Sequence, residues 1–488
     1  MKITKILSIM SASLLASSTL VADAKPIATM KSNSQIKYLE SPKASDSVSG
    51  MFKDGMFYGR LRSNTFYYWW EEESSSKDIH LISALGGSAI FKSSKYNGFD
   101  FGAGLYYSYG MFDKENIPLG NLKAGKDIIS RFNVQNTDST NMAVLGQAYL
   151  RYKPSNKSEV VLGRQIVESF YTKSNDTKMI PNTFDALVIS SKEIASTYVK
   201  LGYLAKQKLR DHTQNHSVLM YGDANSTSLS KPNWSQNDDS AMHQGLTYSA
   251  LKAAGKPTDS ALIIGDIKNK SIKNLSLDTS FYVVPELLSQ VMIEANYKIK
   301  IGDISVAPGI RYIKQADNGA GSVGGASLKA DGATGYTDPT SLDAQMIAAR
   351  VVTKFDKYKI NLGYTNILDE ADLVTPWRGF PTAGYTRSMA RYNWSANTKS
   401  YRIELVRNTS SIGLYNDVYI QASVMFEDKD ADKNSGADKD SFYYYIGFVQ
   451  NVEFLDNAQW RYRFGYQDFV ETSQVNNIDT RFELNYFF

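Results

Sequence analysis

The chain ends in Phe482-Glu483-Leu484-Asn485-Tyr486-Phe487-Phe488, a stretch in which apolar and polar residues alternate. On a β-strand this spacing places Phe482, Leu484, Tyr486 and Phe488 on one face. A strand in the wall of a transmembrane barrel needs such a two-residue period, because one face meets lipid and the other meets water or packed polar groups. The stretch therefore predicts the closing strand of an outer-membrane β-barrel, although any short amphipathic strand shares the pattern.

The N-terminus has the features of an export signal. Lys2 and Lys5 precede an apolar run from Ile6 to Val21, which is followed by Ala22-Asp23-Ala24. This order of basic, apolar and small residues predicts a signal peptide over residues 1–24, so that the mature chain begins at Lys25. No later segment approaches about 18 consecutive apolar residues. Export without a helical anchor leaves the periplasm, the medium or the outer membrane, and the terminal strand favours the last.

The composition agrees with a barrel. The chain has 6 Trp, 22 Phe and 32 Tyr, which suits two interfacial aromatic belts. It has no Cys, so the fold does not rely on disulfides. A formal net charge of +4 argues against a nucleic-acid partner.

Alternation recurs along the chain. In Met292–Gly302 the odd positions from Ile293 are apolar and the even positions from Glu294 are polar, and Gly302-Asp303 then reverses the chain into Ile304–Ile313. Similar strands are expected at Phe57–Tyr67, Met142–Tyr152, Thr197–Tyr203, Tyr358–Thr365, Ser400–Arg407, Val418–Phe426, Phe442–Val449 and Trp460–Asp468. So many strands with tight turns predict an all-β, antiparallel transmembrane barrel over residues 51–488.

Long polar segments separate alternate hairpins and are the expected extracellular loops. They are residues 113–140, 165–192, 206–260, 315–342, 367–397 and 427–440. Residues 25–50 are rich in Ser and Lys and lack alternation. We expect them to form a flexible N-terminal segment that stays in the periplasm or enters the lumen.

One segment resembles a known family. Residues 177–194 run from Thr177-Lys178-Met179-Ile180-Pro181 to Ser191-Lys192-Glu193-Ile194. Together with Gly163-Arg164-Gln165 and Gly59-Arg60-Leu61-Arg62, this segment is similar to the OprD family of outer-membrane porins, and weaker likeness covers most of the mature chain. The chain departs from the family pattern at Asp185 or Ala186, where the family often has Gly.

The resemblance implies an eighteen-stranded, usually monomeric channel whose third extracellular loop folds inward and narrows the lumen. It also implies small, often carboxylate-bearing solutes guided by basic side chains. The implied constriction runs from Gln165 to Glu193, with Lys178 and the Met179-Ile180-Pro181 stretch nearest its narrowest point. Its residues are Arg164, Gln165, Lys178, Met179, Ile180, Pro181, Ser191, Lys192 and Glu193. In the alternative interpretation, Met179 and Pro181 only pack the loop against the wall.

Strand parity sorts the charges without reference to any family. With the apolar face outward, the main basic residues assigned to the lumen are Arg60, Arg62, Arg151, Lys200, Arg311, Arg402, Arg461 and Arg463. The same rule adds Lys298, Lys300, Lys359 and Arg481, against Glu294, Glu404 and Glu483. A lipid-facing charge at the membrane midplane would cost about 2–4 kcal/mol, which favours the lumen. The wall is therefore expected to be positive and to attract anions, although some of these residues are expected to form wall ion pairs.

Catalytic and metal signals are weak. His80, His212, His216 and His243 all fall in expected loops or at their edges. Asp428, Asp430 and Asp432 have calcium-loop spacing, but Lys433 and Lys439 replace the turn Gly and the bidentate Glu, so a solvated loop tip is expected. We expect no cofactor and no enzyme activity.

These features predict a porin in the outer membrane of a Gram-negative bacterium, passing small anionic or zwitterionic solutes. Its expected partners are outer-membrane lipid, lipopolysaccharide and the barrel-assembly machinery, and we expect a monomer. The alternative is a surface adhesin or structural protein that acts through its long loops. An inward-folded loop with basic neighbours distinguishes the two, because an adhesin needs no constriction.

Overall fold

The computed structural model describes residues 27–30, 36–72, 79–112, 122–123, 125–219, 243–329, 333–408, 419–433, 439–452, 454–471 and 473–488. The predicted signal peptide lies outside these residues. Among them, no helix is both long and apolar enough to cross a membrane.

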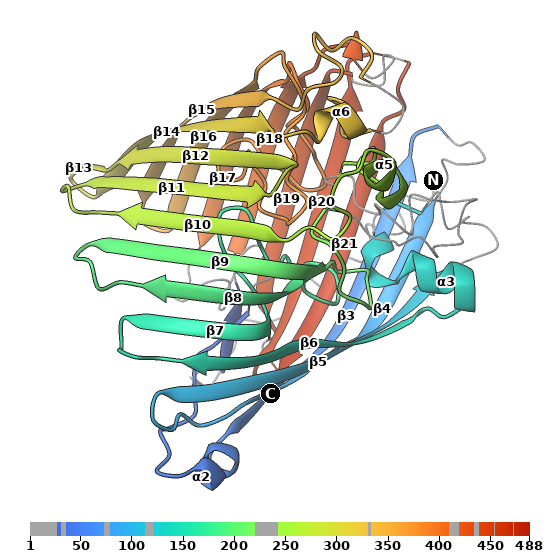
Figure 1. Cartoon of the computed structure of the whole chain (residues 1–488). Coiled ribbons are helices and arrows are strands. Elements are labelled where there is room, and N and C mark those ends of the chain that lie inside the picture. The colour runs from blue at the N-terminus through green and yellow to red at the C-terminus, as the bar shows by residue number, and fades with distance from the viewer. Residues whose placement is uncertain are drawn as a thin grey trace.

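The chain forms one closed antiparallel barrel of 18 strands (Figure 1). The first nine are β3 (Met56–Trp70), β4 (His80–Lys92), β5 (Phe99–Phe112), β6 (Asn141–Tyr152), β7 (Ser158–Gln165), β8 (Thr183–Ser191), β9 (Thr197–Lys208), β10 (Leu262–Asn269) and β11 (Leu275–Val284). The others are β12 (Leu288–Tyr297), β14 (Ile304–Asp317), β15 (Ala344–Phe355), β16 (Tyr358–Ile367), β17 (Lys399–Asn408), β18 (Tyr419–Asp428), β19 (Ser441–Asn451), β20 (Ala458–Phe469) and β21 (Asn477–Phe487). The short β13 (Ile299–Ile301) continues the line of β12 and pairs with β14.

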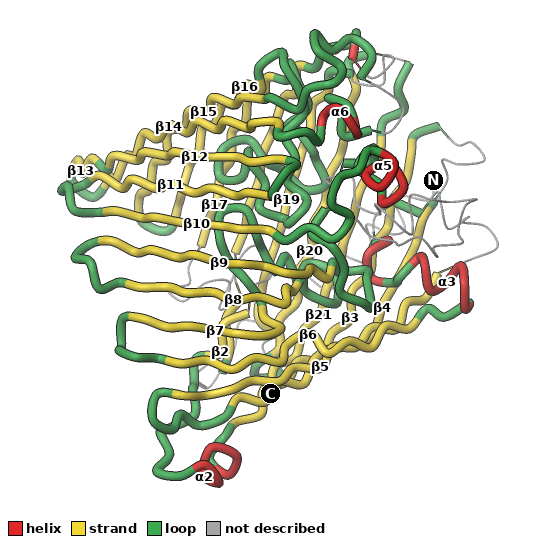
Figure 2. Tube along the Cα trace, viewed as in Figure 1, coloured by secondary structure: helices red, strands yellow, loops and turns green. Residues whose placement is uncertain are grey.

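The smaller elements lie at the two ends of the barrel. A two-stranded sheet of β1 (Ala28–Met30) and β2 (Ile36–Tyr38) precedes α2 (Val48–Lys53). The long connections carry η2 (Lys126–Ile128), α3 (Arg131–Thr137), α5 (Tyr248–Ala253) and α6 (Gly321–Gly324). Figure 2 shows short turns and α2 at one end, called the turn end here, and long loops with the other helices at the opposite, loop end.

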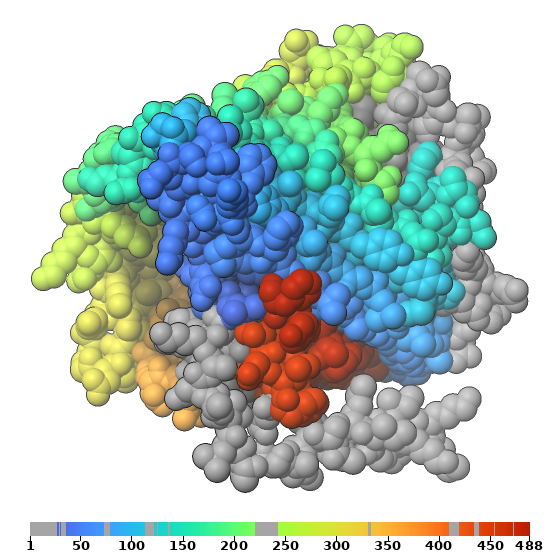
Figure 3. Space-filling view, turned by 90° about the horizontal axis from the view of Figure 1, so that it is seen from below, coloured from blue at the N-terminus to red at the C-terminus, as the bar shows by residue number. Residues whose placement is uncertain are grey.

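The C-terminal strand closes the barrel, as the sequence predicted. β21 pairs with β3, and Phe488 continues the pairing by accepting from the Gly59 N–H at 2.6 Å and donating to the Gly59 carbonyl at 3.1 Å. A Cβ on Gly59 would lie 2.1 Å from the tip of the Phe488 ring, so a larger residue at position 59 would require this ring to move. Figure 3 shows the C-terminal residues beside the early strands on this face of the molecule.

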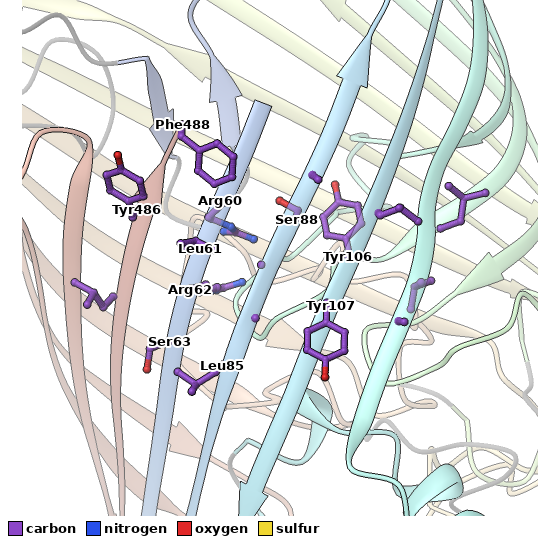
Figure 4. Close-up of a pocket in the computed structure, with 18 residues that line it drawn as sticks. Arg60, Leu61, Arg62, Ser63, Leu85, Ser88, Tyr106, Tyr107, Tyr486 and Phe488 are labelled. Carbon is purple, nitrogen blue, oxygen red and sulfur yellow. The ribbon is translucent and has the colours of Figure 1, made fainter. Parts of the chain in front are cut away.

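The two faces of the wall differ as the alternation requires. Figure 4 shows Arg60 and Arg62 directed to the opposite side of β3 from Leu61 and Ser63. Arg60 is buried, whereas Leu61 is 59% exposed on the outside of the barrel. A closed barrel that presents Leu, Ile, Tyr and Phe side chains on its outer surface suits a lipid bilayer, because closure pairs every strand edge.

The strands expected from alternation are all present, and the hairpin at Gly302-Asp303 is confirmed by the pairing of Ile301 with Ile304. Alternation did not reveal β4, β5, β7, β10, β11 and β15. The expected loop 165–192 is corrected, because its second half is the wall strand β8. The true connection from β7 to β8 is residues 166–182.

Loops pack inside the barrel and form two apolar clusters with the wall. One contains Trp377 and Trp394 of the 368–398 connection together with Phe184, Tyr282 and Met346 from the strands. The other joins Ile128, Ile129, Met179 and Ile180 to Phe66 and Ile82. Much of the lumen at the loop end is therefore a packed core.

Candidate constriction site

Residues 166–182, called the constriction loop here, cross the barrel interior. The loop leaves β7, but its Asp176 carboxylate pairs with both Arg60 and Arg62 of β3, with 2.8 Å between Arg62 Nη1 and Oδ1. Arg62 Nη2 also donates to the Asp176 carbonyl at 2.9 Å. Because β4, β5 and β6 lie between β3 and β7 in the wall, these contacts require the loop to fold inward.

The next residues of the loop follow β3 toward the loop end. Asn64 donates to the Lys178 carbonyl at 2.8 Å, and Lys178 Nζ lies 4.0 Å from the centre of the Phe66 ring. Met179 and Ile180 are completely buried in the apolar cluster around Phe66. Met179 therefore fits both interpretations given above. It belongs to an inward-folded segment, and its side chain packs that segment against the wall.

A second inward segment, residues 368–398, is called the second loop. It meets the constriction loop through the Gly379 N–H, which donates to the Tyr171 carbonyl at 3.0 Å, and through the Lys173 N–H, which donates to the Trp377 carbonyl at 3.0 Å. Arg311 of β14 donates to the Pro381 carbonyl at 2.6 Å. The resemblance implied one inward loop, the third, and the structure adds a second loop that joins it across the lumen.

Five arginines gather on adjacent strands and form the arginine cluster. It consists of Arg461 and Arg463 of β20, Arg481 of β21, and Arg60 and Arg62 of β3. Arg463 lies directly opposite Arg481 in the sheet. All five lie on the inner face and are less than 9% exposed.

Acidic residues offset part of this positive charge. Glu483 accepts from Arg62 at 2.8 Å and lies 3.9 Å from Arg463, and Asp479 accepts from Arg481 Nε at 2.8 Å. With Asp176, three carboxylates stand among five guanidinium groups, so the cluster keeps a positive excess. The side chains of Arg60 and Arg62 are 0% exposed. These two side chains, which were predicted to line the pore, anchor the constriction loop to β3.

Most of the other predicted basic residues are also partnered. Arg151 is 2.9 Å from Asp100, Arg311 Nε donates to Glu294 at 2.6 Å, and Arg402 pairs with Glu404. Lys359 is 3.0 Å from Glu404, and Lys200 donates to the Glu168 carbonyl at 2.6 Å. Lys298 and Lys300 are exposed at the turn end, beside β13. The positive bias is therefore concentrated near the arginine cluster.

Four predicted constriction residues lie elsewhere. Arg164 is on the outer face, in line with the exposed Leu162, and pairs at 2.8 Å with Asp185 of the next strand. Ser191, Lys192 and Glu193 lie at the end of β8 and in the turn after it, at the turn end of the barrel and outside residues 166–182. The implied range ran too far because it included a complete wall strand.

The remaining predicted residues lie at the base of the loop. Gln165 Nε2 donates to the Ala186 carbonyl at 3.0 Å, and the Pro181 carbonyl accepts from Lys208 Nζ at 3.1 Å. Burial lowers the pKa of Lys178 well below its ordinary value, and the charge of Arg481 lowers it further.

Several residues of the site escaped sequence reasoning. Asp176 lies in an aperiodic polar stretch immediately before the family-like segment. Asp127, from the connection before β6, pairs with Arg210 of the connection after β9. Burial opposes ionisation of Asp127, but Arg210 and Lys178 hold its pKa well below the ordinary value.

Arg350 of β15 lies 2.8 Å from Glu294. Of these residues, only Arg350 could have been assigned from the sequence. It lies two positions after Ala348, and strand parity therefore places it on the inward face.

The weaker candidate sites have structural roles. His212 Nδ1 lies 2.6 Å from His216 Nε2, and burial lowers the pKa of His212 to about 3. Ala431 and Asp432 are exposed, as expected of a loop tip, but Lys433 is buried, with Nζ 2.7 Å from Asp369 and 2.9 Å from the Gly335 carbonyl. Within the described residues, no three His, Asp or Glu side chains are grouped to hold a metal ion.

Comparison with solved structures shows the same architecture. No family model and no curated protein matches the sequence. Pseudomonas aeruginosa OpdK, solved with vanillate, has a TM-score of 0.64 at 11% identity, over 88% of this chain and 98% of that one. This chain has the porin fold. P. aeruginosa OccK9 has a TM-score of 0.65 at 14% identity over 90% and 99% of the two chains, and a BenF-like porin from Pseudomonas fluorescens Pf-5 has 0.64 at 13% over 90% and 100%.

Proposed function

We propose that this chain is an OprD-family porin of a Gram-negative outer membrane that gives small anionic or zwitterionic solutes passive passage. Residues 1–24 would direct export, and the barrel-assembly machinery would insert residues 51–488 as a monomer among lipid and lipopolysaccharide. The observation that carries the proposal is the inward constriction loop, which Asp176 fastens to an arginine cluster with excess positive charge.

The arrangement suits selection by charge. Resistance in series is dominated by the narrowest zone, so charges beside the two joined loops have the greatest influence on which ions pass. Guanidinium groups can bind a carboxylate at two points, and low dielectric surroundings strengthen the attraction. Arg461 and Arg463 carry this positive charge along the inner face of β20, beside Arg60 and Arg62, which hold the constriction loop.

Single-channel recording in planar bilayers tests the proposal. We expect anion preference in a salt gradient, and we expect small carboxylates to interrupt the current more than neutral sugars of similar size. The double variant Arg461→Gln, Arg463→Gln should lose most of this preference. Lys298→Gln, Lys300→Gln removes the same charge at the exposed turn end and is the matched control.

Two results would contradict the proposal. A folded protein that conducts no ions would favour the adhesin alternative. Equal loss of selectivity in the two double variants would show that the arginine cluster does not line the conducting path.

A further inference from the structure

The N-terminal hairpin, β1 with β2, is a small structure separate from the barrel wall. Ala28 pairs with Tyr38 and Met30 with Ile36, and the Leu39 N–H donates to the Ile27 carbonyl at 2.9 Å. Ala28 and Met30 are each 1% exposed although they belong to no barrel strand. Their burial means that the hairpin is packed against other parts of the protein.

Its contacts place the hairpin on the inner face of the wall at the turn end. The ring of Tyr38 lies 4.4 Å from that of Tyr58, which shares the inward face of β3 with Arg60. The Tyr58 hydroxyl donates to the Glu40 carbonyl at 2.9 Å. On the other side, the Ile27 N–H donates to Asn457, in the turn before β20, at 3.2 Å. Figure 2 shows β2 within the outline of the barrel.

The hairpin lies beside the arginine cluster. Tyr58 is the next inward position before Arg60 along β3, and the hydroxyl of Tyr38, whose ring packs against that of Tyr58, is buried without a hydrogen-bond partner among the described residues. Lys92 Nζ lies 5.0 Å from the centre of the Tyr58 ring and 5.5 Å from that of Tyr38. The hairpin therefore extends along the inner wall from the turn before β20 to β4. It lies closer to the turn end than the contacts that hold the constriction loop.

We propose that the N-terminal hairpin forms a second constriction at the turn end of the pore, with Tyr38 as its specificity-determining residue. A solute that has passed the constriction loop next meets the Tyr38 and Tyr58 rings and the Lys92 ammonium group, and a small shift of the ring would offer it the unpaired Tyr38 hydroxyl. Such a pair accepts an acidic group by hydrogen bond and charge, while the tyrosine rings offer an apolar surface. The inference rests on one part of the proposed function, which is that the lumen conducts ions and small solutes.

Removal of residues 27–39 tests the inference, because it takes away the hairpin and leaves α2 and the Ala44 bridge to Lys95. We expect unit conductance to rise about 1.5-fold. Because the chain has no natural Cys, Ser88→Cys can report access to the covered wall. An anionic thiol reagent added from the turn end should modify this cysteine about tenfold faster when the hairpin is absent.

Ser423→Cys, on the inward face of β18 and away from the hairpin, is the matched control and should react at one rate in both backgrounds. Tyr38→Ala in the full chain keeps the measurement open if the deletion fails to fold, and it should speed Ser88→Cys modification and weaken current block by aromatic carboxylates. Unchanged conductance and unchanged modification in a folded variant would overturn the inference. If the channel shows no anion preference but removal of the hairpin still changes conductance and Ser88→Cys modification, only the proposed function is refuted.

Discussion

The inner face of the barrel differs between two sectors. Across β20, β21 and β3 it carries the arginine cluster, and the constriction loop is held there by ion pairs to one carboxylate, Asp176. Across β8 to β15, near the loop end, it carries side chains such as Phe184, Tyr282 and Met346, against which Trp377 and Trp394 pack. An inward-facing side chain in this barrel therefore does not always contact water in the lumen.

The two sectors hold their loops by different forces. Burial of a large apolar side chain stabilises by about 1.5–3 kcal/mol, and the apolar sector sums many such contributions. In the charged sector, removal of one partner leaves uncompensated buried charge. We therefore expect the apolar sector to act as a permanent filling, and the charged sector to border the conducting path.

The largest effect should come from the apolar sector. Trp377 is fully buried, its ring lies 4.9 Å from that of Tyr282, and its Nε1 donates to the Val218 carbonyl at 2.8 Å. Trp377→Ala should lower the free energy of unfolding by about 3–5 kcal/mol, measured by urea titration with circular dichroism in lipid vesicles. Trp460→Ala, on the half-exposed outer face, is the control and should cost much less. Equal losses would show that the loop filling contributes little.

A smaller effect on stability, but a large one on conductance, should follow from Asp176→Asn. Without its carboxylate charge the constriction loop loses both arginine ion pairs, so we expect unit conductance to rise about twofold, with stronger anion preference. Asp185→Asn removes the matching charge from the outer pair with Arg164 and should leave conductance unchanged. If both variants conduct like the parent, the ion pairs do not hold the loop in the current path.

Glu483→Gln should change selectivity more than conductance. Glu483 stands between Arg62 and Arg463, so its neutralisation increases the positive excess of the cluster without detaching a loop. We expect roughly a twofold increase in the anion-to-cation permeability ratio, measured from reversal potentials in a salt gradient. Glu159→Gln, near the turn end, should produce a smaller change. A shift toward cations in Glu483→Gln would refute the assignment of the excess charge to the path.

The smallest effect on current should come from Lys433→Ala. This side chain joins the loop after β18 to Asp369 and Gly335, outside both sectors. Cleavage between residues 429 and 440 by proteinase K should become faster, while unit conductance stays within about 10% of the parent. A large conductance change would mean that the outer loops also limit the current.

The division into sectors explains how far the sequence could predict the fold. Strands such as β12, β17 and β20 were predicted because their inward residues include Glu294, Glu404 and Arg461, which preserve alternation. Alternation failed for β4, β10 and β15 because loops cover their inward faces with apolar contacts, so both faces read as apolar. A residue that faces lipid and a residue that packs against an inward loop are both apolar, so the sequence does not distinguish them.

The candidate site was predicted in part for a related reason. Family likeness placed Lys178 to Pro181 in an inward loop, and in the structure Lys178 of this stretch contacts Asn64 and Phe66 of β3. Arg164 could have been assigned correctly from its two-residue spacing to Leu162, which puts both on the outer face. Asp176 could not, because its pairing with Arg60 and Arg62 joins residues more than a hundred positions apart and leaves no periodic pattern.

Comparison of two engineered cysteines in this cysteine-free chain tests the central claim most directly. Arg461→Cys lies in the charged sector and Met346→Cys in the apolar sector, both on the inner face. During single-channel recording, an anionic thiol reagent should react with the cysteine at 461 and reduce the current, and it should leave the channel with a cysteine at 346 unchanged. Equal reaction at both positions, or reaction only at 346, would contradict a conducting path along the arginine cluster.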